Sequence, residues 1–192
     1  MFEKYKDFQD IELAMLASHN DKRALRELLF RTQKDISVFI HYYDPDFLSP
    51  NDLIQEILVK ITNNIKKLKT PTTYKKWSHR IIVNSYYDYV RRINTLKKKI
   101  NYEYNLYEEK NTDIEDTHFR PVEETLNHEL KDKIRGAIMK LPKNHRLVVL
   151  LRDFAGLSYE DIEGILNLNK GTVKSRLARA RNKLKLELKN YL

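Results

Sequence analysis

The chain has 192 residues and a formal net charge of +9, with 36 lysines and arginines against 27 acidic residues. It contains no cysteine, which excludes disulfides, thiolate metal sites and a cysteine nucleophile. Four glycines and five prolines are too few for the turns of an all-β protein, so the composition favours an all-α fold in one medium or two small domains. The positive charge favours a polyanionic partner such as nucleic acid.

The first forty residues predict a helical scaffold. No apolar core of a signal peptide follows Met1, and no stretch reaches the roughly 20 apolar residues of a membrane span. We therefore expect a cytoplasmic protein with no membrane insertion of its own. Apolar residues then recur at helical spacing, which predicts a packed face without chemistry. These residues are Leu13, Leu16, Ala24, Leu25, Leu28, Leu29, Ile36, Phe39 and Ile40.

An amphipathic helix is predicted to begin after Ser49-Pro50-Asn51, with Asn51 as its cap. The candidate binding residues of its first turn are Asp52, Leu53, Gln55 and Glu56. Short acids and an amide on an exposed first turn can pair with arginines of a partner helix, while the leucine holds the core. The alternative is that these acids only favour the helix dipole.

Aromatic and basic side chains are mixed along a helix predicted across residues 74–92. Rings can stack on exposed bases and cations can follow the phosphate backbone, so this mixture is typical of single-strand binding. The candidate contacts are Tyr74, Lys75, Lys76, Arg80, Asn84, Arg91 and Arg92. Trp77, Ile81 and Tyr89 share one helical face and are predicted to be core residues.

An acidic segment separates the two halves of the chain. Between Glu103 and Asp116 six acids face one lysine, and helical periodicity fades. Arg120-Pro121 ends the segment, because the residue before a proline is pushed away from the helical conformation. We therefore predict two small helical domains, at residues 1–98 and 122–192, joined by an acidic flexible linker at residues 99–121.

Four helices are predicted in the second domain. The first has an apolar face between Leu126 and Leu141 and stops at Pro142. The second is capped by Asn144 and breaks at Ala155-Gly156. The third opens with a capping box. Its members are Ser158 and Asp161.

The third and fourth helices match the geometry of a helix-turn-helix, in which the second helix enters the major groove. The turn lies at Asn167-Leu168-Asn169, where asparagine can adopt the left-handed conformation, and Thr172 is predicted to cap the fourth helix. Candidate DNA contacts are Lys170, Gly171, Thr172, Lys174, Ser175, Arg176, Ala178 and Arg179. The alternative is a solvated basic helix. A solvated helix face usually carries acidic residues as well, but residues 170–189 contain a single acidic residue, Glu187.

These motifs resemble those of the extracytoplasmic-function sigma factors, bacterial transcription initiation subunits of the sigma-70 family. The runs 157–162 and 171–181 resemble the domain that reads the minus-thirty-five promoter element. Asp52-Leu53-Ile54-Gln55-Glu56 is similar to the family's polymerase-docking motif, and residues 74–92 are similar to its promoter-melting segment. Glu163 and Asn167 depart from the family, which usually has alanine and glycine there.

The resemblance implies an alternative sigma factor that directs core RNA polymerase to specific promoters. It implies contacts with the clamp helices of the largest subunit and the flap of the second-largest subunit, with promoter DNA and with an anti-sigma factor. It also places Asn84 near a pocket for a base flipped from the minus-ten element, and the acidic linker near the RNA exit path.

No catalytic residue, metal or cofactor is expected, because the histidines lack paired helical spacing and no phosphate loop is present. Two alternatives stay open at this point. One is a helix-turn-helix regulator that binds duplex DNA without joining polymerase, and the other is a nucleic-acid-modifying enzyme.

Overall fold

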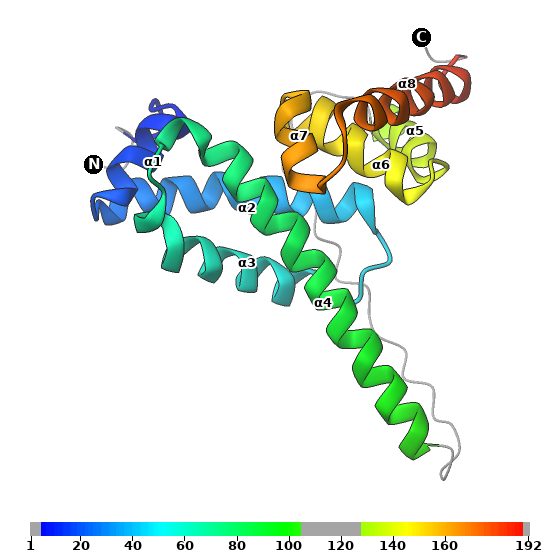
Figure 1. The fold of residues 1–192 in the computed structure, drawn as a ribbon, viewed down its shortest axis with the longest axis horizontal. Helices are drawn as coiled ribbons and strands as arrows, with labels where there is room; N and C mark the ends of the chain where they lie inside the picture. Colours follow the sequence, from blue (N-terminus) through cyan, green and yellow to red (C-terminus); the bar gives the residue numbers. More distant parts are fainter. Residues whose placement is uncertain (1–4, 105–127, 190–192) are drawn as a thin grey trace.

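The computed structural model describes residues 5–104 and 128–189, which form helices and turns without a strand (Figure 1). The predicted all-α class and the two groups of helices are therefore confirmed for the part of the chain that the structure describes. None of the helices within those ranges is both long and apolar enough to cross a membrane.

The first group of helices packs around one apolar core. It consists of α1 (Asp10–Ser18), α2 (Lys22–Tyr43), α3 (Pro50–Asn64), the 3-10 turns η2 (Ile65–Lys67) and η3 (Pro71–Thr73), and α4 (Tyr74–Tyr104). The predicted scaffold face is confirmed, because Leu13, Ala24 and Leu28 are fully buried. Leu16, Leu25 and Leu29 pack against the same core while partly exposed.

The α4 helix runs past the predicted domain boundary at residue 98 and ends at Tyr104, and its second half projects away from the other helices (Figure 1). No glycine or proline interrupts residues 74–104, so nothing in this stretch stops the helix. Residues 99–104 of the predicted linker are thus helical. The rest of the linker and the start of the predicted second domain, residues 105–127, lie outside the described residues.

The second group consists of α5 (His128–Met139), α6 (Lys143–Val149), the π-helical turn η4 (Leu150–Phe154), α7 (Tyr159–Leu166) and α8 (Lys170–Glu187). The α6 helix continues into η4, where the Ala155 amide donates to the Leu150 carbonyl at 2.9 Å. The predicted break follows at Gly156, whose φ of +65° is a left-handed conformation that glycine adopts without steric cost.

The helix-turn-helix follows the predicted local signals closely. The Asp161 amide donates to the Ser158 hydroxyl at 3.0 Å, and the Ser158 amide donates to the Asp161 carboxylate at 3.3 Å, which confirms the capping box. Asn167 ends α7 in the left-handed conformation, at φ 52° and ψ 48°. The turn therefore forms although the family's usual glycine is replaced.

Three predicted helix caps are wrong, namely Asn51, Asn144 and Thr172. The α3 and α6 helices begin two residues earlier than predicted, α3 at Pro50 and α6 directly after Pro142, because the fixed φ of proline suits the edge of a first turn. Asn169 caps α8, since its extended backbone lets the side chain accept the Thr172 amide at 2.7 Å.

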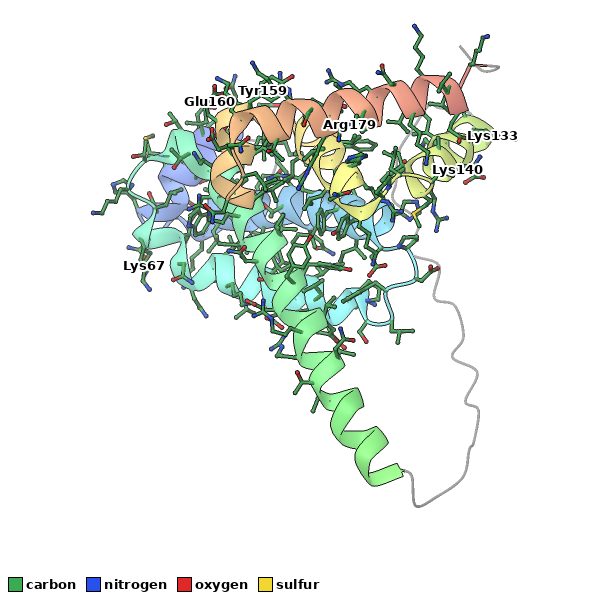
Figure 2. All side chains as sticks on the ribbon, turned by 45° about the vertical axis from the view of Figure 1, so that its right-hand side comes forward. Lys67, Lys133, Lys140, Tyr159, Glu160 and Arg179 are labelled. Atoms are coloured by element: carbon green, nitrogen blue, oxygen red, sulfur yellow. The ribbon has the colours of Figure 1, made fainter. Side chains whose placement is uncertain are left out.

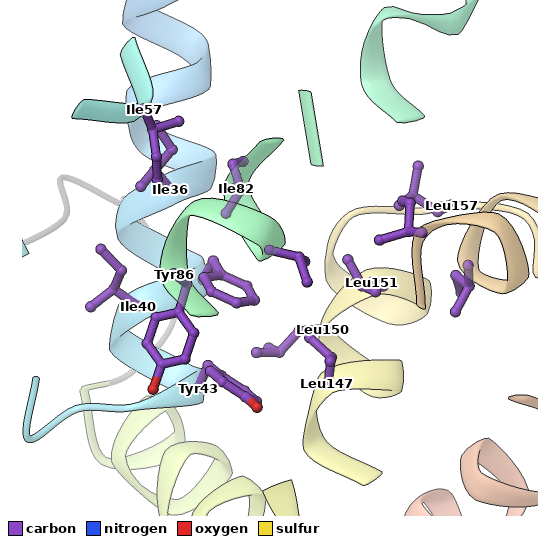
Figure 3. Packing of buried hydrophobic residues seen from close by; sticks show 14 of the residues in the cluster. Ile36, Ile40, Tyr43, Ile57, Ile82, Tyr86, Leu147, Leu150, Leu151 and Leu157 are labelled. Atoms are coloured by element: carbon purple, nitrogen blue, oxygen red, sulfur yellow. The ribbon is translucent and has the colours of Figure 1, made fainter. Parts of the chain in front are cut away.

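The two groups of helices pack on each other along α2 and α4. The α7 helix lies beside the first half of α4, and α6 and η4 lie along α2 (Figure 1). Tyr43 and Tyr86 of the first group lie next to Leu147 and Leu150 of the second (Figure 3), and all four belong to one buried cluster.

Candidate nucleic-acid and polymerase interfaces

The predicted polymerase-binding motif lies on the first turns of α3, where Asp52 and Gln55 are exposed and Leu53 is fully buried. Glu56 is mostly buried, with an exposed fraction of 25%, and forms ion pairs with Lys60 at 2.7 Å and with Arg92. Desolvation acts to raise the pKa of Glu56, but hydrogen bonds from these two cations outweigh it and lower that pKa. Glu56 thus fastens α3 to α4, and Asp52 and Gln55 are the open residues of the motif.

Tyr74, a predicted stacking residue, lies in the core at the start of α4. Its hydroxyl shares a hydrogen bond of 2.7 Å with the buried Thr32 hydroxyl. Burial raises the pKa of Tyr74, so the phenol stays neutral. Its ring is not presented to a partner in this arrangement.

Lys75, Lys76 and Arg80 lie on the α4 face next to α7, where Lys76 is half-buried and the other two stay exposed. The Lys76 ammonium pairs with the Asp161 carboxylate at 3.1 Å. The Arg80 guanidinium donates from Nη2 to the Gly164 carbonyl at 2.7 Å, and Lys75 lies beside Gly156. The structure therefore brings these three predicted contacts together against α7 and its leading turn.

Asn84, Arg91 and Arg92 lie further along α4 and are exposed. Arg91 pairs with Asp88 at 3.4 Å, whereas Arg92 pairs with Glu56 and lies 5.3 Å from the centre of the Tyr89 ring. The predicted core residues Trp77, Ile81 and Tyr89 are partly buried against the core. Asn84 is consequently an exposed polar residue between two groups of basic residues. The basic residues on either side of it pair with other groups of this protein.

The recognition helix α8 has a buried inner stripe and an exposed outer face. Val173, Leu177 and Ala180 are buried, while Lys174, Ser175, Ala178 and Arg179 are exposed. Arg179 and the start of α7 at Tyr159 and Glu160 lie along the outer edge of the molecule (Figure 2). Gly171 is also exposed, and Thr172 and Arg176 are half-buried. The predicted contacts therefore gather on one accessible side.

The N-terminal end of α8 is tied to α7 by charge. Lys170, a predicted DNA contact, forms an ion pair with Glu160. The Glu160 carboxylate, and to a smaller extent that of Glu163, raises the pKa of Lys170. Glu163, where the family usually has alanine, is half-buried and thus contributes negative charge beside the start of the recognition helix.

Tyr159 and Asp153 position α8 and were missed by the sequence reasoning. The Tyr159 ring centre lies 4.9 Å from the Arg152 guanidinium and 5.8 Å from the Lys174 ammonium, which are cation–π distances. The Asp153 carboxylate accepts from both Nε and Nη2 of Arg181, on one edge of the guanidinium. No periodic pattern marks these pairs, because the partners lie on different helices.

Comparison with known proteins matches both groups of helices. Residues 29–95 match the family Sigma-70 region 2, and residues 131–184 match the family Sigma-70, region 4. The chain is 30% identical over 179 residues to the ECF RNA polymerase sigma-E factor of Haemophilus influenzae, covering 90% of this chain and 91% of that protein. It is 27% identical to the RNA polymerase sigma-H factor of Pseudomonas aeruginosa, covering 96% of each.

The solved structures with a similar fold include two complexes. One is the sigma factor RpoE in complex with the anti-sigma factor NepR from Bartonella quintana, with a TM-score of 0.62 at 23% identity, covering 84% of this chain and 92% of that chain. The other is CnrH in complex with the cytosolic domain of CnrY, with a TM-score of 0.58 at 20% identity, covering 94% and 97%. At these identities the likeness concerns the fold alone.

Proposed function

Because the chain belongs to the extracytoplasmic-function sigma factors of the sigma-70 family, which direct RNA polymerase to promoters, we propose that its two domains divide promoter recognition between them. We call helices α1 to α4 domain 2 and helices α5 to α8 domain 4. The family membership sets aside both alternatives raised from the sequence, the polymerase-independent regulator and the nucleic-acid-modifying enzyme.

Domain 2 docks on core RNA polymerase through the first turns of α3. Asp52 and Gln55 contact the clamp helices of the largest subunit, because they are exposed at a helix start where short polar groups reach a partner helix. Leu53 and Glu56 hold that turn in place, one by core packing and the other by its ion pairs. Domain 4 contacts the flap of the second-largest subunit.

The α4 helix binds the unpaired minus-ten strand. Lys75, Lys76, Arg80, Arg91 and Arg92 supply charge for the phosphate backbone, and exposed Asn84 supplies a donor and an acceptor for a flipped base. Tyr74 contributes by packing beneath this surface. Opening a duplex costs stacking energy, which such contacts offset in part.

The exposed face of α8 reads the minus-thirty-five duplex. Lys174, Ser175 and Arg179 face base edges, with Ala178 as an apolar contact. Lys170, Gly171, Thr172 and Arg176 contact phosphates near the helix start. The observation that carries this assignment is the division of α8 between a buried stripe and an exposed basic side.

A further proposed partner is an anti-sigma factor. The two solved structures named above are complexes with another protein, and in one of them a sigma factor is bound to an anti-sigma factor. The α3, α4 and α8 surfaces are the ones that such a partner has to cover to block polymerase or DNA.

Transcription reconstituted from core polymerase, this protein and genomic DNA tests the proposal, with start sites mapped by sequencing. Asp52→Lys is expected to lower core binding and initiation by at least tenfold, since it reverses a charge at a docking helix. The matched control is the same reversal at exposed Asp7, outside α3. If both variants initiate equally well, the proposed docking surface is wrong.

A further inference from the structure

Residues 57–87 contain no acidic residue, although they span most of α3, both 3-10 turns and the first half of α4. Seven cationic residues lie in this stretch, namely Lys60, Lys66, Lys67, Lys69, Lys75, Lys76 and Arg80. A solvated protein surface usually carries charges of both signs, so an unmixed surface of this extent indicates an anionic partner.

The seven cations differ in what they contact. Three of them bind groups of other elements, namely Lys60, Lys76 and Arg80. The lysines of η2 and the residue pair that follows it are exposed, and we call them the lysine patch: Lys66, Lys67 and Lys69. Lys67 donates to the neutral Asn64 side chain at 3.0 Å. Within residues 5–104 and 128–189, none of the three pairs with a carboxylate.

Buried neighbours hold the lysine patch in a fixed position. Ile65 and Leu68 are buried on either side of the first two lysines, and the Leu68 amide donates to the Ile65 carbonyl at 3.0 Å. In the next turn, which begins at Pro71, the Thr73 amide donates to the Thr70 carbonyl at 3.0 Å. The α1 helix packs against both turns. The patch therefore needs no reordering of the backbone to meet a partner.

The lysine patch extends the surface proposed for the minus-ten strand. The α4 helix begins directly after η3, and Asn84 lies ten residues beyond Tyr74 on it. At a rise of 1.5 Å per residue, this is about 15 Å. A stacked strand advances about 3.4 Å per nucleotide, so the patch begins about four nucleotides from a base bound at Asn84. Lys67 lies at the outer edge of domain 2, apart from the labelled residues of domain 4 (Figure 2).

The chemistry of the two turns suits phosphates and not bases. Residues 66–73 contain lysines and threonines but no aromatic ring and no amide side chain. Lysine ammonium groups and threonine hydroxyls are common phosphate contacts, and Thr70 and Thr72 are exposed beside the patch. An acidic protein surface could neutralise the same lysines, but the direct continuation into α4 favours DNA.

We propose that Lys66, Lys67 and Lys69 bind phosphates of the unpaired DNA strand that flanks one end of the minus-ten element. This inference rests on the proposed binding of that strand by α4. The patch adds affinity without sequence preference, because phosphates carry no sequence information. It thereby lengthens the strand that the protein holds beyond the bases that α4 reads.

The test uses core polymerase loaded with this protein and a fluorescent promoter DNA whose minus-ten region is unpaired, with the promoter taken from the mapped start sites. The patch variant combines Lys66→Gln, Lys67→Gln and Lys69→Gln. The control variant removes the same charge at three exposed positions before and on α2, by Lys6→Gln, Lys22→Gln and Lys34→Gln.

Binding is measured by anisotropy over a series of salt concentrations. At about 0.1 M salt the patch variant is expected to bind at least tenfold more weakly, and the slope of log K against log salt is expected to become shallower by about 2, since each single-strand phosphate contributes about 0.7. The control variant should change affinity less than twofold. Equal losses in the two variants overturn the inference.

Shortened DNA tests where the lysine patch binds. Two further probes end at the minus-ten element, one without the 5′ flanking strand and one without the 3′ flanking strand. The patch variant and the unchanged protein are expected to bind equally to one of these probes and differently to the other. A difference that persists on both probes shows a general charge effect and overturns the inference.

Two measurements identify the other ways in which the inference can fail. The patch variant is expected to bind core polymerase normally; a loss of core binding shows that the lysines meet a protein, and overturns the inference. Asn84→Ala tests the underlying assignment of α4. If Asn84→Ala weakens binding to every probe and the patch variant weakens none, only the inference fails. If Asn84→Ala binds and initiates normally, the assignment of α4 to the minus-ten strand fails as well.

Discussion

The α4 face and the α8 face are both basic helix surfaces, but they differ in how many of their cations pair with other groups of the protein. On α4, Lys76, Arg80 and Arg92 each hold a carboxylate or a carbonyl of the protein. On α8, Lys170 and Arg181 pair with Glu160 and Asp153, but Lys174 and Arg179 between them are exposed on the outer side of the molecule. A run of cations in a sequence thus indicates a surface for DNA, but the tertiary contacts decide whether that surface is open before DNA arrives.

The largest expected effect tests the inner side of α8. Leu177→Ala is expected to lower the free energy of unfolding by about 2–5 kcal/mol, because it leaves a cavity in a packed core. Arg179→Ala on the same helix is the control, and at an exposed position its effect should stay within about 0.5 kcal/mol. Denaturant unfolding followed by circular dichroism measures both, and similar losses would contradict the division of α8 into two faces.

The next largest effect is expected on DNA binding by the free protein, where the α8 and α4 surfaces are compared. Arg179→Ala is expected to weaken binding to a promoter duplex by about 1–3 kcal/mol, because α8 is already open. Asn84→Ala should leave that affinity unchanged and lower initiation only with polymerase present. Anisotropy at one fixed salt concentration measures the duplex affinity. A loss of equal size for Asn84→Ala would break the contrast between the surfaces.

A smaller effect concerns the turn that sets the angle of α8. Asn167→Ala is expected to destabilise the protein by about 1 kcal/mol, because alanine is strained in the left-handed conformation that asparagine accepts. Asn167→Gly is the control and should cost no stability, since glycine adopts this conformation freely. Thermal unfolding measures both variants, and an equal loss for glycine would show that the asparagine side chain is what matters.

The smallest expected effect probes the boundary between the domains. Desolvation beside a cavity between the two domains raises the pKa of Asp35 to about 6, and the partly opposing charge of Lys75 does not cancel this rise. Burial lowers the pKa of His79 to about 4, so the histidine that lines the same cavity stays neutral and offers no counter-charge.

A raised carboxyl pKa means that the folded protein favours the neutral acid, so this group costs stability above about pH 6 and the cost fades as the pH falls towards about 4. Asp35→Asn is therefore expected to stabilise the protein at about pH 8, by less than about 1 kcal/mol, because the Asp35 side chain is exposed and solvent screens its charge. The gain should shrink at about pH 5. Thermal unfolding at both pH values measures it, with exposed Asp46→Asn as the control; a gain independent of pH would contradict a desolvated boundary.

Local signals in the sequence were sufficient where a few neighbouring residues decide the structure. The Ser158 capping box, the Asn167 turn and the Gly156 break all follow from the conformations of single residues. The predicted caps at Asn51, Asn144 and Thr172 were wrong. Several neighbouring residues can cap a helix, and the position at which the backbone leaves the helical conformation determines which of them does. The predicted end of the first domain at residue 98 lies within α4, because fading periodicity does not end a helix that contains no glycine or proline.

The sequence by itself determined the helical class, the helix-turn-helix and the order of the three motifs, since these depend on periodicity, composition and short spacings. Only the tertiary structure decided which motif residues are open. Glu56 meets Arg92, Arg80 meets Gly164 and Arg146 meets Tyr43 across separations of 36, 84 and 103 residues. Contacts at such separations depend on how whole helices pack, so the pattern of neighbouring residues carries no trace of them.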